Sequence, residues 1–177
     1  GILNVTPDSF FDGGKYFSLY DAVNHALRMQ NEGADIIDIG GQSTRPGAKE
    51  ISVEEEKKRV IPVIEKLIRK IKIPISIDTY RSEIAKEALK LGAKMVNDVT
   101  ALRGDKKLAQ IISHYNVPIC LMHMKGEPKN MQENPSYKDV VKEISNFLKE
   151  RSDFAISCGI KKDKIIIDPG LGFGKRT

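Results

Sequence analysis

The chain has 177 residues, 40% of them hydrophobic, which suffices for one domain with its own core and excludes an intrinsically disordered chain. Its 29 Lys and Arg against 24 Asp and Glu give a formal net charge of +5, which suits an anionic substrate, and no basic block is long enough to favour nucleic acid. Cys120 and Cys158 have neither metal-ligand spacing nor the pattern of a disulfide framework, and no stretch resembles a membrane span. We therefore expect a cytoplasmic protein that binds neither nucleic acid nor membranes.

Short apolar runs alternate along the chain with longer segments of helical periodicity. Strands are predicted at residues 2–5, 35–39, 75–79, 95–99, 118–124 and 164–168. The intervening helices are predicted from Ser18 to Gly33, from Ser52 to Ile71, from Ile84 to Gly92, from Asp105 to Ile112, and from Tyr137 to Cys158.

Local signals refine the helix boundaries. Ser52 and Glu55 have the spacing of a capping box, Pro62 predicts a kink or a restart, and Asp105 is a candidate N-cap for the fourth helix. The last helix is expected to turn its apolar side chains inward, namely Val140, Val141, Ile144, Phe147, Leu148 and Phe154.

The alternation of strands and helices implies right-handed crossovers and a parallel sheet. A doubly wound sheet would gather its ligand groups at one switch point, whereas a (β/α)8 barrel recruits them from many strand ends. Polar side chains at or near strand ends favour the barrel: Asn4, Asp38, Asp78, Asn97, Asp98, His123 and Asp168. We expect an α/β fold with about the first six units of a (β/α)8 TIM barrel, because a complete barrel has about 250 residues. Residues 1–177 would then form a single domain that is incomplete at its C-terminal end.

A glycine-rich run at residues 170–175 superficially suggests a phosphate loop. Its spacing is one residue short of G-x-x-x-x-G-K, and Arg176 stands where the magnesium-binding Ser or Thr belongs. It also fails as a dinucleotide fingerprint, so the alternative is a flexible loop that positions Phe173. His123 lies between two methionines and is either a packed histidine or a general base.

The carboxylates at the strand ends have two interpretations. A single aspartate in such a position is more often a helix cap than a catalyst. Asp38, Asp78 and Asp168, with Asn97, would however converge on one barrel mouth, where they could bind a flat heterocycle with adjacent N–H groups. Asn4 and an arginine would remain for an anion and its metal. Residues 35–48 are in the same way either an ordinary connection or an active-site loop.

Several blocks of the sequence closely resemble the dihydropteroate synthase family. They are ILNVTPDSF at 2–10 with DGG at 12–14, DIGGQSTRPG at 38–47, SIDT at 76–79, ND at 97–98, LMHM at 121–124 and DPGLGFGK at 168–175. The resemblance implies condensation of 6-hydroxymethyl-7,8-dihydropterin diphosphate with p-aminobenzoate, which releases diphosphate. An S_N1-like substitution suits that chemistry, because Mg²⁺ stabilises the leaving diphosphate and conjugation stabilises the pterin-methyl cation. The resemblance also implies a TIM barrel, Mg²⁺ as cofactor and a homodimer.

The resemblance assigns roles by position. Asp78, Asn97 and Asp168 would hold the pterin, with Asp38 facing the same pocket, and Asn4 would ligate Mg²⁺. The reaction would involve Asp8 and Asp12 of a first loop and Thr44 and Arg45 of a second, while Gly172 and Phe173 would edge the p-aminobenzoate pocket with Arg45 and Pro46. Two rival functions stay open, a methyltransferase that binds a methylated folate and a pterin-binding module without activity.

Overall fold

The computed structural model describes residues 1–6, 19–43, 50–126, 131 and 135–175. Its strands are β1 (Ile2–Asn4), β2 (Ile37–Gly40), β3 (Ile75–Asp78), β4 (Met95–Asp98), β5 (Ile119–Met122) and β6 (Ile165–Asp168). Its helices are α1 (Leu19–Asn31), α2 (Val53–Leu67), α3 (Ser82–Leu91), α4 (Leu108–Tyr115), α5 (Val140–Ser157) and the short 3-10 helix η1 (Lys162–Lys164). Every predicted strand and helix is therefore present.

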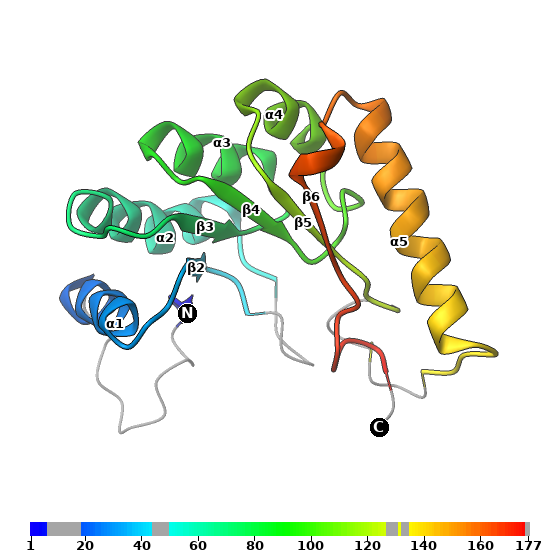
Figure 1. Ribbon diagram of the computed structural model, residues 1–177. Helices are drawn as coiled ribbons and strands as arrows, with labels where there is room; N and C mark the ends of the chain where they lie inside the picture. Colours follow the sequence, from blue (N-terminus) through cyan, green and yellow to red (C-terminus); the bar gives the residue numbers. More distant parts are fainter. Residues whose placement is uncertain (7–18, 44–49, 127–130, 132–134, 176–177) are drawn as a thin grey trace.

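The six strands form one parallel sheet in the order β1-β2-β3-β4-β5-β6, which is also their order in the sequence. A doubly wound sheet would reverse this order at its switch point, and the described sheet does not. Figure 1 shows α1 to α5 following one another around the outside of the curved sheet. Sequential strands under a single layer of helices confirm the predicted β/α barrel architecture.

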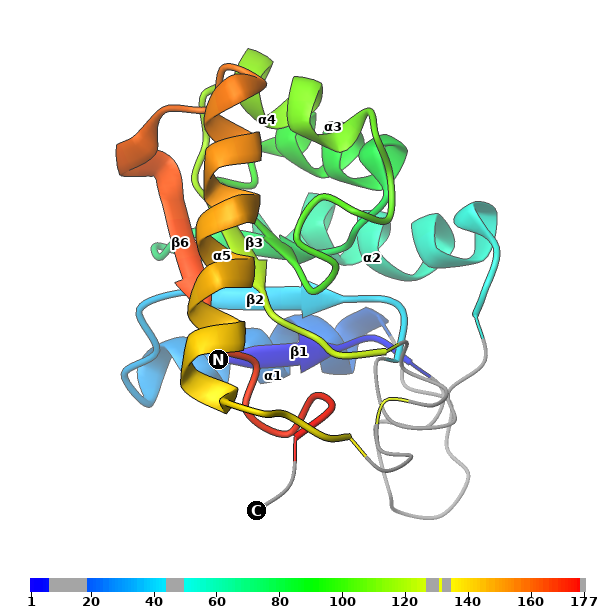
Figure 2. The same ribbon diagram turned by 90° about the vertical axis from the view of Figure 1, so that its right-hand side faces the viewer.

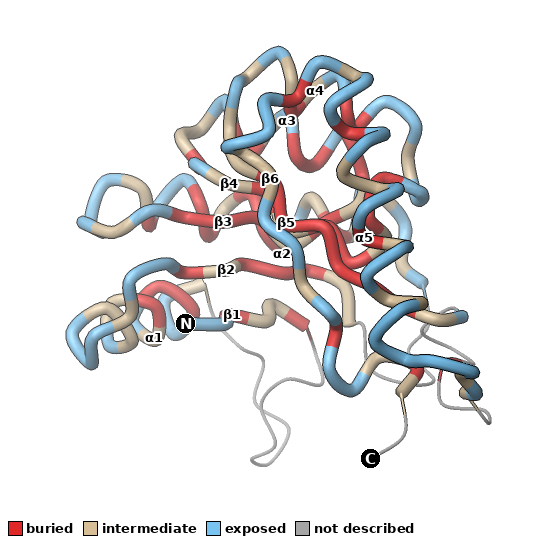
Figure 3. Tube along the Cα trace, turned by 45° about the vertical axis from the view of Figure 1, so that its right-hand side comes forward, coloured by how far each residue is buried: buried red, intermediate tan, exposed pale blue. Residues whose placement is uncertain are grey.

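The core lies between the strands and this helical layer. Strand residues of this core include Leu3, Ile39, Ile77 and Leu121, none of which has solvent-exposed surface. The helices add an apolar stripe each, such as Val60, Ile64 and Leu67 on α2. Figure 3 shows this burial concentrated along the strands and on the sides of the helices that face them. Burying each such side chain contributes about 1.5–3 kcal/mol to the stability of the folded chain. This packing holds in place the strand ends that carry the polar residues.

Two predicted helix boundaries, at Ser52 and at Gly92, are confirmed. The Ser52 hydroxyl accepts a hydrogen bond from the Glu55 N–H at 3.1 Å, as the capping box requires. Gly92 closes α3 with a φ of 118°, a conformation that residues with a Cβ rarely adopt. The helix does not restart at Pro62, because α2 is continuous through it. Asp105 serves two helices. Its Oδ1 accepts the Lys107 N–H at 2.8 Å just before α4, where the N-cap position itself is Lys107, and its Oδ2 accepts the Ser82 N–H at 2.9 Å at the start of α3.

The prediction that α5 turns six apolar residues inward is wrong for three of them. Val140 is 42% exposed, Val141 71% and Phe154 38%, whereas Leu148 is buried. Figure 2 shows α5 lying along β5 and β6. A helix of 18 residues is about 27 Å long, twice the length of the four-residue strands beneath it, so its first turn has no strand to cover.

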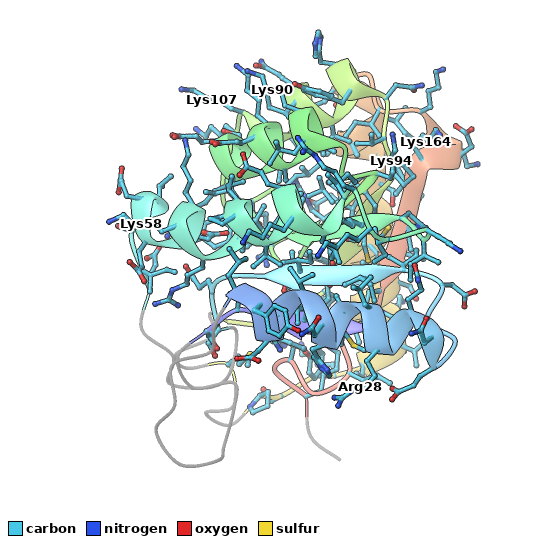
Figure 4. The ribbon with its side chains drawn as sticks, turned by 90° about the vertical axis from the view of Figure 1, so that its left-hand side faces the viewer. Arg28, Lys58, Lys90, Lys94, Lys107 and Lys164 are labelled. Carbon is cyan, nitrogen blue, oxygen red and sulfur yellow. The ribbon has the colours of Figure 1, made fainter. Side chains whose placement is uncertain are left out.

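Basic side chains are spread over the outer surface. Figure 4 shows labelled side chains on separate elements or next to them, namely Arg28, Lys58, Lys90, Lys94, Lys107 and Lys164. Within the described part of the chain, no helix is long and apolar enough to cross a membrane.

Candidate active site at the carboxyl ends of the strands

The strand register brings the predicted polar residues together. Asp78 at the end of β3 is level with Gly40 on β2 and with Asn97 on β4. Across these strands, the Asn97 side-chain amide donates a hydrogen bond to Asp38 Oδ2 at 2.8 Å. Asp168 ends β6 and is level with Met122 on β5. Asn4, Asp78 and Asp168 thus end three strands of one parallel sheet, and Asp38 and Asn97 lie on the strands between them.

Gly40 leaves room for side chains from the strands on either side of it. A Cβ at this position would lie 3.2 Å from Asp78 Oδ2 and 3.5 Å from Asn4 Oδ1. Side-chain oxygens of Asn4 on β1 and Asp78 on β3 therefore both lie close to the β2 backbone at Gly40, in space that a larger residue would partly fill. Glycine at this position thus leaves room beside the β2 backbone for two of the predicted site residues.

The carboxyl group of Asp78 has a strongly perturbed pKa. Burial raises its pKa well above the ordinary range, and the negative charges of Asp38, Asp98 and Glu56 raise it further. Asp38 Oδ1 is buried and has no hydrogen-bond partner among the described residues. Buried acceptors of this kind are costly unless a donor reaches them, so this region is suited to a ligand with several N–H groups.

Asp168 is oriented by its own loop. Its Oδ1 accepts the Gly170 N–H at 2.7 Å, and a Cβ at Gly170 would run into the carbonyl oxygen of His123. Gly170 has a φ of 66°, so glycine is required both for the turn and for this contact. The loop continues through the exposed Gly172 to Phe173, which packs on a small cluster made of Val99, Met122, Met124 and Met131.

His123 is packed rather than open to solvent. Its side chain lies edge-on to the Phe147 ring with the centroids 4.9 Å apart, and Lys175 Nζ lies 3.0 Å from Nδ1. Burial and the neighbouring Lys175 charge lower the pKa of His123. The structure therefore supports the packed interpretation of the two that the sequence left open.

Asp98 is the last residue of β4, and its carboxylate bonds to the following loop instead of joining the ligand-facing group. Its Oδ1 accepts hydrogen bonds from the Thr100 N–H and hydroxyl, and its Oδ2 accepts the Leu102 N–H at 2.6 Å. These bonds hold a turn in which Ala101 and Leu102 both have positive φ. Asp98 is therefore neither a helix cap nor a ligand-facing group, because its carboxylate holds the turn that follows its own strand.

Two buried polar features escaped the sequence analysis. Cys120 is level with Asn97, and burial together with the charges of four aspartates raises the pKa of its thiol to about 12. Side chains alternate between the two faces of a strand, so Cys120 shares a face of β5 with Met122, two residues on. Applying this alternation to the sequence would have placed the thiol beside the site. Glu56 on α2 is buried against Arg81 and Thr79, with bonds of 2.8 and 2.7 Å. It stands in an acidic first turn, where nothing in the sequence distinguishes it from its exposed neighbours.

The predicted loop residues Asp8, Asp12, Thr44, Arg45 and Pro46 lie outside the described residues. For Mg²⁺, the described residues contain no cluster of three or more His, Cys, Asp or Glu that could hold a metal ion. Mg²⁺ that is carried by a phosphorylated substrate keeps most of its ligands as water and phosphate oxygens, so it needs only one or two protein oxygens. The amide oxygen of Asn4, near Gly40 and Asp78, fits that requirement.

The fold and this set of residues define a class of protein. Residues 1–177 match the family of pterin binding enzymes, and the chain belongs to that family. It is 51% identical over 175 residues to the dihydropteroate synthase of Escherichia coli strain K12, an alignment that covers 99% of this chain and 62% of that protein.

Two solved structures are similar to this chain. The Yersinia pestis dihydropteroate synthase with a sulfonamide drug complex has a TM-score of 0.94 and 45% identity, covering 99% of this chain and 64% of that one. The Xanthomonas albilineans dihydropteroate synthase with 4-aminobenzoic acid has a TM-score of 0.90 and 49% identity, covering 99% of this chain and 62% of that one. The chain thus spans less than two thirds of the length of these relatives.

Proposed function

We propose that this chain provides the pterin site of a dihydropteroate synthase, which joins 6-hydroxymethyl-7,8-dihydropterin diphosphate to p-aminobenzoate. The observation that carries the proposal is the group of Asp38, Asp78 and Asn97 on adjacent strands, linked by the bond from Asn97 to Asp38. An amino-pyrimidine edge presents adjacent N–H groups, and carboxylates accept such pairs in parallel. The similarity to a dihydropteroate synthase with 4-aminobenzoic acid supports the second substrate.

In the proposed reaction, the bond between the pterin methylene carbon and the diphosphate oxygen breaks, and its electron pair leaves with diphosphate. The lone pair of the amine nitrogen then forms the new carbon–nitrogen bond, and the amine proton passes to solvent. Asp38 and Asp78 hold the pterin and favour the positive charge that develops on it. Mg²⁺ at Asn4 would offset the negative charge of the leaving diphosphate. No general base is needed, because an aromatic amine is already neutral and nucleophilic.

The remaining roles follow from the same proposal. Thr44 and Arg45 would act on the diphosphate and Pro46 on the aromatic substrate, while Asp8 and Asp12 would belong to the other loop of the site. Asp168 would complete the pterin contacts from β6, where Gly170 already orients its carboxylate. Gly172 and Phe173 follow in the same loop and would edge the p-aminobenzoate pocket.

The test is a turnover assay on the full-length gene product that carries these residues. We expect diphosphate release that requires Mg²⁺, the pterin diphosphate and p-aminobenzoate together, with dihydropteroate as product. A methyltransferase would instead consume a methylated folate and release no diphosphate, and a silent module would bind pterin without turnover. Either of those outcomes would refute the proposal.

Two wider proposals accompany this function. Cys120 and Cys158 are both free thiols, which agrees with the proposed cytoplasmic location. The homodimer stays a prediction, and sedimentation velocity on the full-length gene product tests it.

A further inference from the structure

The Lys175 ammonium group lies among acceptors from two separate strand ends. Its Nζ donates to the carbonyl oxygens of Gly170 at 2.8 Å and Phe173 at 2.9 Å, both in the loop after β6. It also lies 3.0 Å from His123 Nδ1 and 3.3 Å from the His123 carbonyl oxygen, directly after β5. We call this arrangement the Lys175 clamp.

The chemistry of the clamp defines the state of both side chains. An ammonium group has three N–H donors and no acceptor, and the two loop carbonyls with His123 Nδ1 satisfy all three. Because Lys175 donates to Nδ1, the neutral His123 ring carries its proton on Nε2. Burial lowers the pKa of Lys175, and the nearby Asp168 charge opposes this effect. The positive charges of Arg103 and Lys125 also act on His123. With burial and the charge of Lys175, they lower the pKa of the His123 ring.

The clamp determines the shape of the turn that presents Phe173. The Phe173 N–H donates to the Gly170 carbonyl oxygen at 3.0 Å, and Lys175 binds the carbonyl oxygens of both residues. The end of the loop is held independently, because the Tyr137 hydroxyl donates to the Gly174 carbonyl oxygen at 2.6 Å. The segment after β6 thus lies beside the segment that leads into α5, as Figures 1 and 2 both show.

Asp168 and Phe173 stand on either side of the clamp. Asp168 is fixed by the β6 ladder and by the Gly170 N–H, so it does not depend on Lys175 for its position. Phe173 ends the turn. Its ring packs on the cluster around Met122 and Met131, and the described hydrogen bonds of its backbone go to Gly170 and Lys175. Loss of the ammonium group would therefore displace the aromatic ring more than the carboxylate.

We propose that Lys175 is a positioning residue that holds Phe173 as the aromatic wall for the aryl amine substrate. This inference rests on the proposed function, because it takes the substrate beside Phe173 to be p-aminobenzoate. Lys175 acts through the loop and through His123, and it is not assigned a contact with either substrate. Its effect should therefore fall on the second substrate and spare the pterin, whose carboxylates lie on strands.

The first test compares Lys175→Met with the parent in the full-length gene product. Methionine fills similar space but cannot donate hydrogen bonds, and we expect KM for p-aminobenzoate to rise about tenfold or more, as displaced substrate-positioning groups do. KM for the pterin diphosphate should change less than about threefold, since the strand carboxylates are intact. Lys161→Met, an exposed change at the opposite end of β6, is the matched control and should leave both constants unchanged. Equal changes in both KM values, or none, would overturn the inference.

A second pair of variants tests the acceptor. His123→Asn keeps an oxygen near the position of Nδ1 and should largely retain the parent KM for p-aminobenzoate, whereas His123→Leu removes the acceptor and should raise it. A purely structural role for His123 would make both variants alike, contrary to the proposal. Melting temperatures of all variants separate these effects from unfolding.

A third measurement does not depend on turnover. Nitrogen NMR of the His123 ring in the parent should show the Nε2–H tautomer, and Lys175→Met should raise the pKa of His123 by removing the adjacent positive charge. A parent ring protonated on Nδ1, or a His123 pKa that Lys175→Met leaves unchanged, would show that the clamp does not exist, which refutes the inference. If the clamp is seen but the parent makes no dihydropteroate, the proposed function fails and the assignment to p-aminobenzoate fails with it.

Discussion

Replacing Asp78 by asparagine should weaken pterin binding and stabilise the free protein at the same time. Asparagine keeps the size of the side chain and one acceptor oxygen but has no negative charge. Losing a charge-assisted hydrogen bond to the pterin costs about 1.5–3 kcal/mol. That cost corresponds to a dissociation constant that is roughly 10- to 150-fold higher.

The stabilising effect follows from the raised pKa of Asp78. Its carboxyl group is buried and faces the charges of Asp38, Asp98 and Glu56, so its ionised form is disfavoured in the folded state. Its contribution to stability is present below the unfolded pKa, near pH 4, and is lost as the pH rises through the raised pKa of the folded state. Asp78→Asn does not undergo this loss. It should therefore melt at a higher temperature than the parent at pH values above the unfolded-state pKa.

The same raised pKa predicts that pterin binding releases a proton. Pterin N–H groups favour the ionised carboxylate, so binding lowers the pKa of Asp78. The affinity for the pterin should therefore rise as the pH rises through the pKa of Asp78 in the ligand-free protein. Calorimetry of the full-length gene product in two buffers of different ionisation enthalpy measures this release directly. The asparagine variant should release no proton from this position, and Asp153→Asn on the exposed surface of α5 should behave as the parent does. Parent-like affinity and proton release in Asp78→Asn would show that Asp78 does not bind pterin.

Three further changes test the framework of the site. Glu56→Ala leaves Arg81 with only part of its partners and should lower the free energy of unfolding by about 3 kcal/mol in urea titrations, and a loss below 1 kcal/mol would contradict the buried pair. Gly41→Ala places a Cβ 3.1 Å from Glu56 Cγ and should cost about 1–3 kcal/mol in the same titrations, with an unchanged midpoint as the refuting result. Asp98→Asn should speed hydrogen exchange at the Leu102 amide, and unchanged protection there would exclude the turn-holding role.

Most of the fold could be predicted because it depends on patterns that repeat. Apolar strand runs and helical periodicity locate the six described strands and five α-helices but not the short η1, and glycines such as Gly92 mark helix ends by backbone conformation alone. The outward position of Val140 and Val141 could not be predicted, because periodicity identifies an apolar face without saying how much of it the rest of the fold covers. The same limit applies to the second bond of Asp105: its carboxylate accepts from Lys107 beside α4 and also from Ser82 on α3, which is distant in the sequence.

The site could be predicted where residues end strands, since parallel strands present their carboxyl ends on one side. That rule located Asp78 and Asp168, but it also collected Asp98, whose oxygens are used within its own loop. Glu56 had no comparable signal, because its partner Arg81 follows a different strand and meets it only in three dimensions.

The number of hydrogen bonds that each carboxylate accepts distinguishes structural from ligand-facing acidic residues better than their position on strands does. Among the bonds between described residues, Asp98 accepts three and Glu56 two, so the fold itself satisfies them. Asp38 and Asp168 accept one each, from Asn97 and Gly170.

A carboxylate that the protein satisfies is a structural part of the fold, whereas one that it leaves short of donors destabilises the free protein. Sequences retain such groups where a ligand supplies the missing donors, since stability is readily given up at functional sites. Asp38 has a buried oxygen without a described partner, and Asp78 has its pKa raised by burial and by three acidic neighbours. The unsatisfied side of the barrel mouth is therefore where β2 and β3 end, and the N–H edge of the pterin should lie against these two strands.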